Sequence, residues 1–348
     1  MTQGNQQEQQ ECRYREELIP FRAGDGFQCN LIHVQGKTPH KGPVLLVPGS
    51  GVRANLFRPP VETTIVDYLV AHDYDVWLEN WRASIDLPHN FWTLDQGALY
   101  DHPEAVKTVV ERTGWDKIKA VIHCQGSTSF MMAAVAGLVP QVTTIVSNAV
   151  SLHTVVPALS HFKLEVGFPL ISPFTRYIDS QWGLHAPSGI AKAVNFCAEM
   201  MYHECDNLVC KNVSFMYGTL WRHENLNNET HEWIKREFAH APLSFFKQIA
   251  QCIQVGHLVS VEGERALPED YVAQSPQTDA RIAFFVGEEQ QCFLPESQVR
   301  SFQFFDKRRQ NYHSLHILPR YGHLDVFIGQ NASKDVFPLI VQELDKPC

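Results

Sequence analysis

The sequence predicts an α/β fold, in which a doubly wound, mostly parallel sheet is covered by a helical cap insertion. Short apolar segments, typical of strands buried on both faces, alternate with helical segments over most of the 348 residues. Residues 151 to about 275 interrupt this alternation and are rich in His, Cys, Trp and Phe. An insertion between two core strands is expected to lie over the carboxyl ends of the strands, where open α/β sheets bind ligands.

Each core element follows from a local pattern. Apolar segments bounded by turn residues predict strands at residues 14–22, 27–35, 43–47, 75–79, 117–123, 142–148, 281–286 and 314–318. Longer segments predict helices at residues 61–72, 103–113, 125–138 and 335–344. The Gln-rich start has no apolar segment, so it is expected to be disordered and not a signal peptide. The predicted division is a disordered N-terminus (1–11), a first core part (12–150), the cap (151–275) and a second core part (276–348).

Composition excludes several classes of protein. With 44% hydrophobic and 19% charged residues, a net charge of -9 and no basic block, the chain is globular and not expected to bind nucleic acid. No apolar run has transmembrane length, since Pro140, Gln141 and Asn148 interrupt the longest candidate. Nine irregularly spaced cysteines and no secretion signal predict reduced thiols and a cytoplasmic protein.

The segment from Val121 to Ser127 is the strongest indication of function. Cys124 lies where a predicted strand turns sharply into a predicted helix, the context of the nucleophile in a G-x-S-x-G turn. Gly126 matches the second glycine, whereas Ile122 occupies the position of the first. A free Cys is most often a small buried hydrophobe, but the N-terminus of a helix favours a reactive thiolate. We therefore expect Cys124 to form a covalent acyl thioester.

Backbone N–H groups near Cys124 are expected to form an oxyanion hole. One donor should be Gln125, directly after the nucleophile, and the other should be Ser50 or Gly51 in the loop after the strand at 43–47. This glycine-containing loop has neither a P-loop nor a dinucleotide-binding motif, so we expect no cofactor.

Several motifs resemble those of α/β-hydrolases, and specifically of the acid lipases, the gastric and lysosomal group. The similar segments are Glu79-Asn80-Trp81-Arg82 with Ala83, Phe91-Trp92-Thr93-Leu94-Asp95, Tyr100-Asp101-His102-Pro103, His123-Cys124-Gln125-Gly126-Ser127-Thr128, His240-Ala241-Pro242 and Tyr321-Gly322-His323-Leu324-Asp325. The chain is also similar to bacterial α/β-hydrolase domains associated with cholesterol-oxidase-like flavoproteins. In both comparisons, cysteine replaces the nucleophilic serine.

The resemblance implies that His323 is the catalytic base. The third member of the catalytic group should follow the strand at 281–286, where the chain reads Gly287-Glu288-Glu289-Gln290-Gln291. We predict Glu289, with Gln290 as the alternative if the turn is placed one residue later. Asp325 is expected to support the loop that carries His323.

The cap contains candidate pocket and metal residues. Trp221, His240 and Phe245 are expected to line an apolar substrate pocket. A second set of cap residues contains possible zinc ligands: His203, Cys205, Cys210 and His223. Its spacing has no C-x₂-C element, so we expect these residues to pack the helices and predict no metal site.

Together these features predict an acyl-transfer enzyme that acts on a hydrophobic ester or thioester, lipid-like or polyketide-like, or on a carrier-bound acyl group. The acyl-cysteine would be resolved by water, as in an esterase or thioesterase, or by an acceptor, as in an acyltransferase or cyclase. The alternative is a non-catalytic descendant that binds a ligand or a partner, which the replaced serine and the missing first glycine favour.

Overall fold

The computed structural model describes residues 14–36, 39–149 and 152–347, so the predictions for residues 1–11, Cys12 and Cys348 lie outside it. It contains an eight-stranded sheet in the order β1-β2-β4-β3-β5-β6-β9-β10, in which β1 and β2 pair antiparallel and the strands from β4 onward are parallel. The strands are β1 (Arg15–Arg22), β2 (Gln28–Gln35), β3 (Pro43–Val47), β4 (Asp75–Asn80), β5 (Ile118–His123), β6 (Val142–Asn148), β9 (Arg281–Gly287) and β10 (Ser314–Leu318). The predicted fold class is confirmed.

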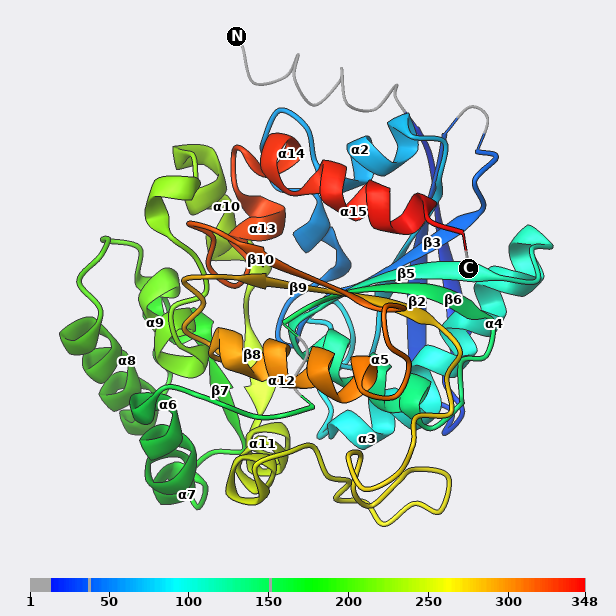
Figure 1. Ribbon diagram of the computed structural model, residues 1–348. Coiled ribbons are helices and arrows are strands. Elements are labelled where there is room, and N and C mark those ends of the chain that lie inside the picture. The colour runs from blue at the N-terminus through cyan, green and yellow to red at the C-terminus, as the bar shows by residue number, and fades with distance from the viewer. Residues whose placement is uncertain (1–13, 37–38, 150–151, 348) are drawn as a thin grey trace, which may run out of the picture.

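Helices cover both faces of this sheet, which explains why its central strands are mostly buried. All residues of β3 and β9 are buried, as expected for parallel strands between two helical layers. In Figure 1, α2 and α15 lie on one face and α5 and α12 on the other. The main core helices are α2 (Ile65–Ala71), α4 (His102–Thr113), α5 (Cys124–Val135), α12 (Pro295–Asp306) and α15 (Phe337–Asp345). Shorter helical segments are η1 (Ala54–Phe57), α3 (Leu94–Gln96), η2 (Gly97–Asp101), α13 (Asp325–Ile328) and α14 (Ala332–Asp335).

The chain between β6 and β9 forms a largely helical region, here called the β6–β9 insertion. Its elements are α6 (Ala158–Phe162), η3 (Lys163–Gly167), α7 (Phe168–Ile171), β7 (Tyr177–Asp179), η4 (Ser180–Gly183), α8 (Gly189–Met201), α9 (Leu208–Tyr217), η5 (His223–Asn225), α10 (Asn228–Glu237), β8 (His240–Pro242) and α11 (Leu243–Val255). β7 and β8 pair with each other and not with the main sheet. That the insertion acts as a cap with the predicted boundaries remains a prediction.

Hydrogen bonds join the β6–β9 insertion to the loops at the carboxyl ends of the strands. Ala239 donates its backbone N–H to Gly51 in the loop after β3, at 3.0 Å. The loop after β10 is also joined to the insertion, because the backbone N–H of His323 donates to the carbonyl of Leu220 at 3.0 Å. The insertion is therefore joined to the loops at the end of the sheet that carries Cys124. Within the part of the chain that the structure describes, no helix combines the length and the apolarity needed to cross a bilayer.

Candidate active site

Cys124 occupies a strained turn between β5 and α5. β5 ends at His123 and α5 begins at Cys124, whose φ of 55° lies in the left-handed region that residues other than glycine rarely adopt. Gly126 allows α5 to approach the end of β3, since a Cβ at this position would lie 2.0 Å from the carbonyl oxygen of Pro48. Ile122, at the position of the missing first glycine, is a fully buried residue of β5. The backbone geometry is that of a nucleophile elbow.

Two backbone N–H groups converge on the sulfur of Cys124. The N–H groups of Gln125 and Ser50 both lie close enough to Sγ to lower the pKa of the Cys124 thiol. Ser50 comes this close because Gly49 has no side chain; a Cβ there would lie 2.9 Å from Cβ of Cys124. The N–H of Gly51 instead donates to the carbonyl of Ala83 at 3.2 Å, so Ser50 is the loop donor of the two predicted candidates. Donors in this position suit a negative charge that develops beside the sulfur.

His323 is fully buried next to Cys124. One side-chain ligand atom from each of His323, Cys124 and His123 lies within 4.8 Å of the other two. Nδ1 of His323 donates to Oε1 of Gln290 at 2.7 Å, whereas Nε2 is buried and has no hydrogen-bond partner among the described residues. Because the amide oxygen is an acceptor, the ring proton lies on Nδ1 and Nε2 keeps the lone pair that a general base needs.

The prediction that Glu289 orients His323 is wrong. The side chain of Glu289 is 44% exposed and forms an ion pair with Arg222. In the turn after β9, the N–H of Glu289 donates to Tyr321 at 2.9 Å and that of Gln290 to Gly287 at 3.2 Å, and this path turns residue 290 inward. Gln290, the alternative that the sequence left open, is buried and makes the contact with the imidazole ring.

The sequence analysis missed two further polar residues in this cluster. The ring of His123 lies 4.8 Å from that of His323, and its Nδ1 accepts a hydrogen bond from Nδ2 of Asn148 at 2.9 Å. Nδ2 of Asn148 also donates to the backbone carbonyl of His323 at 3.1 Å. Asn148 is the last residue of β6 and lies opposite His123 in the register. In the sequence, the only sign that Asn148 belongs to this cluster is its position at the carboxyl end of a strand next to β5.

Burial keeps both members of the Cys–His pair neutral. It raises the pKa of Cys124 to about 12, although the N–H groups of Gln125 and Ser50 oppose the shift. Burial also lowers the pKa of His323 to about 3. A thiolate–imidazolium pair is therefore not the resting state of this site. The resting pair is a neutral thiol beside a neutral imidazole, an arrangement that suits general-base catalysis.

A small apolar cavity lies directly above Cys124. It has a volume of about 10 Å³, close to the space for one water molecule, and its walls combine core loops with the β6–β9 insertion. The insertion contributes Tyr217, Leu220 and Phe238, and the core contributes Gly49, Ser50, Val52, Leu56, His123, Cys124, His323 and Leu324.

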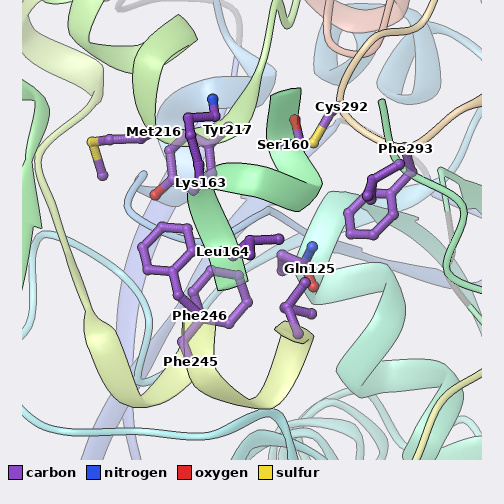
Figure 2. A pocket seen from close by; sticks show the side chains of 12 residues that line it. Gln125, Ser160, Lys163, Leu164, Met216, Tyr217, Phe245, Phe246, Cys292 and Phe293 are labelled. Carbon is purple, nitrogen blue, oxygen red and sulfur yellow. The ribbon is translucent and has the colours of Figure 1, made fainter. Parts of the chain in front are cut away.

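A second cavity, of about 30 Å³, lies beside Gln125 and also borders Tyr217. Figure 2 shows side chains of η3 and α11 facing Gln125 across this space, among them Leu164, Phe245 and Phe246. One charged group lies among them: burial lowers the pKa of Lys163 to about 8, and its Nζ donates to the carbonyl of Phe215 at 2.6 Å. Phe245 thus borders a cavity next to the site, and its role as a substrate-pocket residue remains a prediction.

The other two predicted pocket residues lie elsewhere. Neither Trp221 nor His240 lines either cavity. Trp221 is buried against Phe238, and the ring of His240 stacks on that of His89 at 3.5 Å. His240 thus packs the insertion against the core and Trp221 packs within the insertion, and sequence alone does not distinguish such packing from a pocket wall.

Asp325 supports the His323 loop from below. Its Oδ1 accepts the N–H of Gly322 at 2.9 Å, and its Oδ2 accepts a hydrogen bond from Nδ2 of Asn225 at 2.5 Å. Burial raises the pKa of this carboxyl group to about 6. These contacts match the supporting role that was expected for Asp325.

Comparisons with known proteins agree with this architecture. No family model matches the sequence. The chain is 24% identical over 186 residues to sterol esterase 2 of Saccharomyces cerevisiae and 28% identical over 171 residues to lipase 1 of Drosophila melanogaster. These matches cover 48% and 45% of this chain but only 35% and 37% of the two relatives, so the chain spans little more than a third of their length.

In structure, the chain is similar to a thermophilic esterase from Thermogutta terrifontis. The TM-score is 0.57 at 13% identity, and the similarity covers 95% of this chain and all of the esterase (100%). The chain therefore has the α/β-hydrolase fold, and its sequence resembles those of a lipase and a sterol esterase.

Proposed function

We propose that the protein is an esterase-type acyl-transfer enzyme that forms a covalent acyl thioester on Cys124. The observation that carries the proposal is the convergence of three groups on one sulfur atom. Sγ of Cys124 faces the N–H groups of Gln125 and Ser50, and the unprotonated Nε2 of His323 lies beside it. The similarity to a sterol esterase and a lipase supports ester chemistry.

In the first half-reaction, Nε2 of His323 accepts the thiol proton while Sγ of Cys124 attacks the carbonyl carbon of the substrate. The carbonyl oxygen becomes an oxyanion that the N–H groups of Gln125 and Ser50 stabilise. The bond from the carbonyl carbon to the leaving group then breaks, and the imidazolium returns the proton to that group. Gln290 keeps the ring oriented throughout, as the amide partner does in other Cys–His–amide sites.

In the second half-reaction, His323 takes a proton from the acceptor, which attacks the thioester. The carbon–sulfur bond breaks and the thiol of Cys124 is restored. If the acceptor is water, the product is a free acid; an alcohol or amine gives a new ester or amide. The two outcomes use the same residues and differ in their products.

The surroundings of Cys124 favour a hydrophobic substrate. Both cavities are bordered mainly by apolar side chains. In the insertion segment from Ala158 to Ile171, Leu164 lines the cavity beside Gln125. The same segment has four exposed apolar side chains, at Leu159, Phe162, Val166 and Leu170. The apolar character of these walls favours an ester or thioester with an apolar acyl group, lipid-like or polyketide-like.

Replacement of the nucleophile tests the proposal. Incubated with p-nitrophenyl esters and quenched in acid, the wild-type protein should release p-nitrophenol and show a mass increase equal to one acyl group. Cys124→Ala should lose both signals, and Cys124→Ser should be impaired because a hydroxyl needs stronger base assistance. Cys197→Ala, which removes an exposed thiol of α8, is the matched control and should keep both. Undiminished turnover in Cys124→Ala would refute the covalent mechanism.

A further inference from the structure

Four potential metal ligands meet in the β6–β9 insertion. Cys205 lies in the loop between α8 and α9, Cys210 in the first turn of α9, His223 at the start of η5 and His231 in α10. One ligand atom from each of the four lies within 4.8 Å of the other three. The sequence analysis predicted no metal site for His203, Cys205, Cys210 and His223, and the structural cluster differs from that set in one member, since His203 is exposed and His231 completes the group.

The geometry within this cluster matches tetrahedral zinc. Zn–S bonds of about 2.3 Å and Zn–N bonds of about 2.0–2.1 Å, arranged tetrahedrally, place sulfur and nitrogen about 3.5–3.6 Å apart. Sγ of Cys210 and Nε2 of His223 are 3.5 Å apart. Nε2 of His231 is buried and has no hydrogen-bond partner among the described residues, as expected for a nitrogen that a metal would use. Both thiols are free.

The outer groups around the cluster also suit a metal site. Nδ1 of His223 pairs with Oε2 of Glu204 at 3.1 Å, the carboxylate–histidine arrangement that orients metal-bound imidazoles. The side chain of Trp221 lies beside the sulfur of Cys210. Asn207 connects two ligand segments, because its Oδ1 accepts the N–H of Cys210 at 3.1 Å and its Nδ2 donates to the carbonyl of His231 at 2.8 Å.

We propose that Cys205, Cys210, His223 and His231 bind one Zn²⁺ ion in a closed structural site with the spacing C-x₄-C-x₁₂-H-x₇-H. Two thiols lose their protons on binding, and the thiolates and imidazoles fill all four coordination positions. A site of this kind has no open position for a substrate, so its role is to hold the insertion together.

The zinc site would also brace the segment that positions the catalytic base. Between Cys210 and His223, the chain passes through Leu220, whose carbonyl accepts the N–H groups of His323 at 3.0 Å and Leu324 at 2.7 Å. Directly after His223, Asn225 binds Asp325 in the same loop. Fixing the two ends of this segment through a metal therefore fixes the loop of His323.

Metal binding can be measured on the whole protein without reference to activity. The reduced protein, stripped with a chelator, should bind one Zn²⁺ per chain in competition with a chromophoric chelator, and zinc should raise its Tm. With Co²⁺ it should show the visible bands of a tetrahedral complex and a near-ultraviolet charge-transfer band for two thiolates. This spectrum is read on the wild-type protein, so it does not depend on the folding of any variant.

Variants then assign the ligands. Cys205→Ser and His223→Ala should each weaken zinc binding by more than about 100-fold. This exceeds the loss of about 10- to 100-fold that is typical when a hydrogen-bond partner of a metal ligand is replaced. Cys197→Ser and His203→Ala, exposed neighbours outside the cluster, should bind zinc normally. Cys124→Ala should also bind normally, since the group formed by His123, Cys124 and His323 has other functions. The proposal fails if the reduced protein binds no zinc, if Cys205 and Cys210 form a disulfide in the purified protein, or if Cys124→Ala alone abolishes binding.

Discussion

The contact between Gln290 and His323 makes the sharpest prediction about the mechanism. Gln290→Ala would remove the only described partner of Nδ1 in a fully buried ring, which the wild type holds with a 2.7 Å hydrogen bond. Leaving a buried donor unpaired costs about 1–3 kcal/mol. The ring can avoid this cost by moving its proton to Nε2, but Nε2 can then no longer accept the thiol proton. Either response raises the barrier, and 1–3 kcal/mol corresponds to a decrease of about 5- to 150-fold in kcat/KM.

The decrease should be read from initial rates of p-nitrophenyl ester hydrolysis, with circular dichroism to verify the fold. Gln290→Glu tests the direction of the pKa shift of His323. A carboxylate beside Nδ1 stabilises the imidazolium, so the pKa of His323 should rise and the acid limb of the pH–rate profile should move to higher pH. Glu289→Ala is the matched control, because this neighbouring side chain is exposed and pairs with Arg222. A Gln290→Ala enzyme as fast as the wild type, or a Glu289→Ala enzyme equally damaged, would refute the assignment.

Two further predictions concern the substrate and the buried base. Phe246→Ala enlarges the cavity beside Gln125, so it should raise kcat/KM for long-chain esters relative to short-chain esters; Phe174→Ala, at a 72% exposed position, should leave the ratio unchanged. The folded pKa of His323, about 3, lies below the value of 6.5 for a free histidine, so its contribution to stability is complete above pH 6.5 and decreases as the pH falls towards 3. His323→Asn should therefore lessen the pH dependence of the free energy of unfolding in this window, by up to about 1.4 kcal/mol per pH unit in urea titrations, whereas the exposed His203→Asn should not.

The core of the fold was largely predictable because its signals are local. Buried parallel strands read as short apolar runs, and the predicted strand at 43–47 coincides with β3 (Pro43–Val47). Helix ends were less accurate: the helix predicted at 61–72 spans only Ile65–Ala71, since Thr64 forms a capping box with Asp67 and starts the helix there. Other residues in this segment could also begin the helix, and which of them does so depends on the packing of the preceding loop.

The site was predictable where a motif fixes backbone geometry and not where side-chain direction decides. The positions of Cys124 and of the Gln125 N–H follow from the turn itself, so the sequence placed them together. The choice between Glu289 and Gln290 depends on where the turn after β9 begins, and a difference of one residue decides it. The side chain of Glu289 points to the surface, whereas that of Gln290 points to His323. The spacing of His203, Cys205, Cys210 and His223 predicts no metal site, and nothing in the sequence indicates His231, because the segments of the cluster meet only through tertiary packing.

The replacements at positions 124 and 290 make chemical sense as a pair. A serine hydroxyl is a poor nucleophile at neutral pH, and a carboxylate beside the histidine helps by stabilising the imidazolium that forms as the proton leaves. A thiol loses its proton far more readily and is the stronger nucleophile, so less assistance from the third residue is required. Gln290 can then be neutral, and its oxygen still fixes the ring tautomer at 2.7 Å. A buried carboxylate at that position would carry a desolvation cost that a neutral amide avoids. The neutral Cys124–His323–Gln290 group is thus a consistent solution for a base that is buried beneath an apolar insertion, and the departures from the serine motif need not indicate loss of activity.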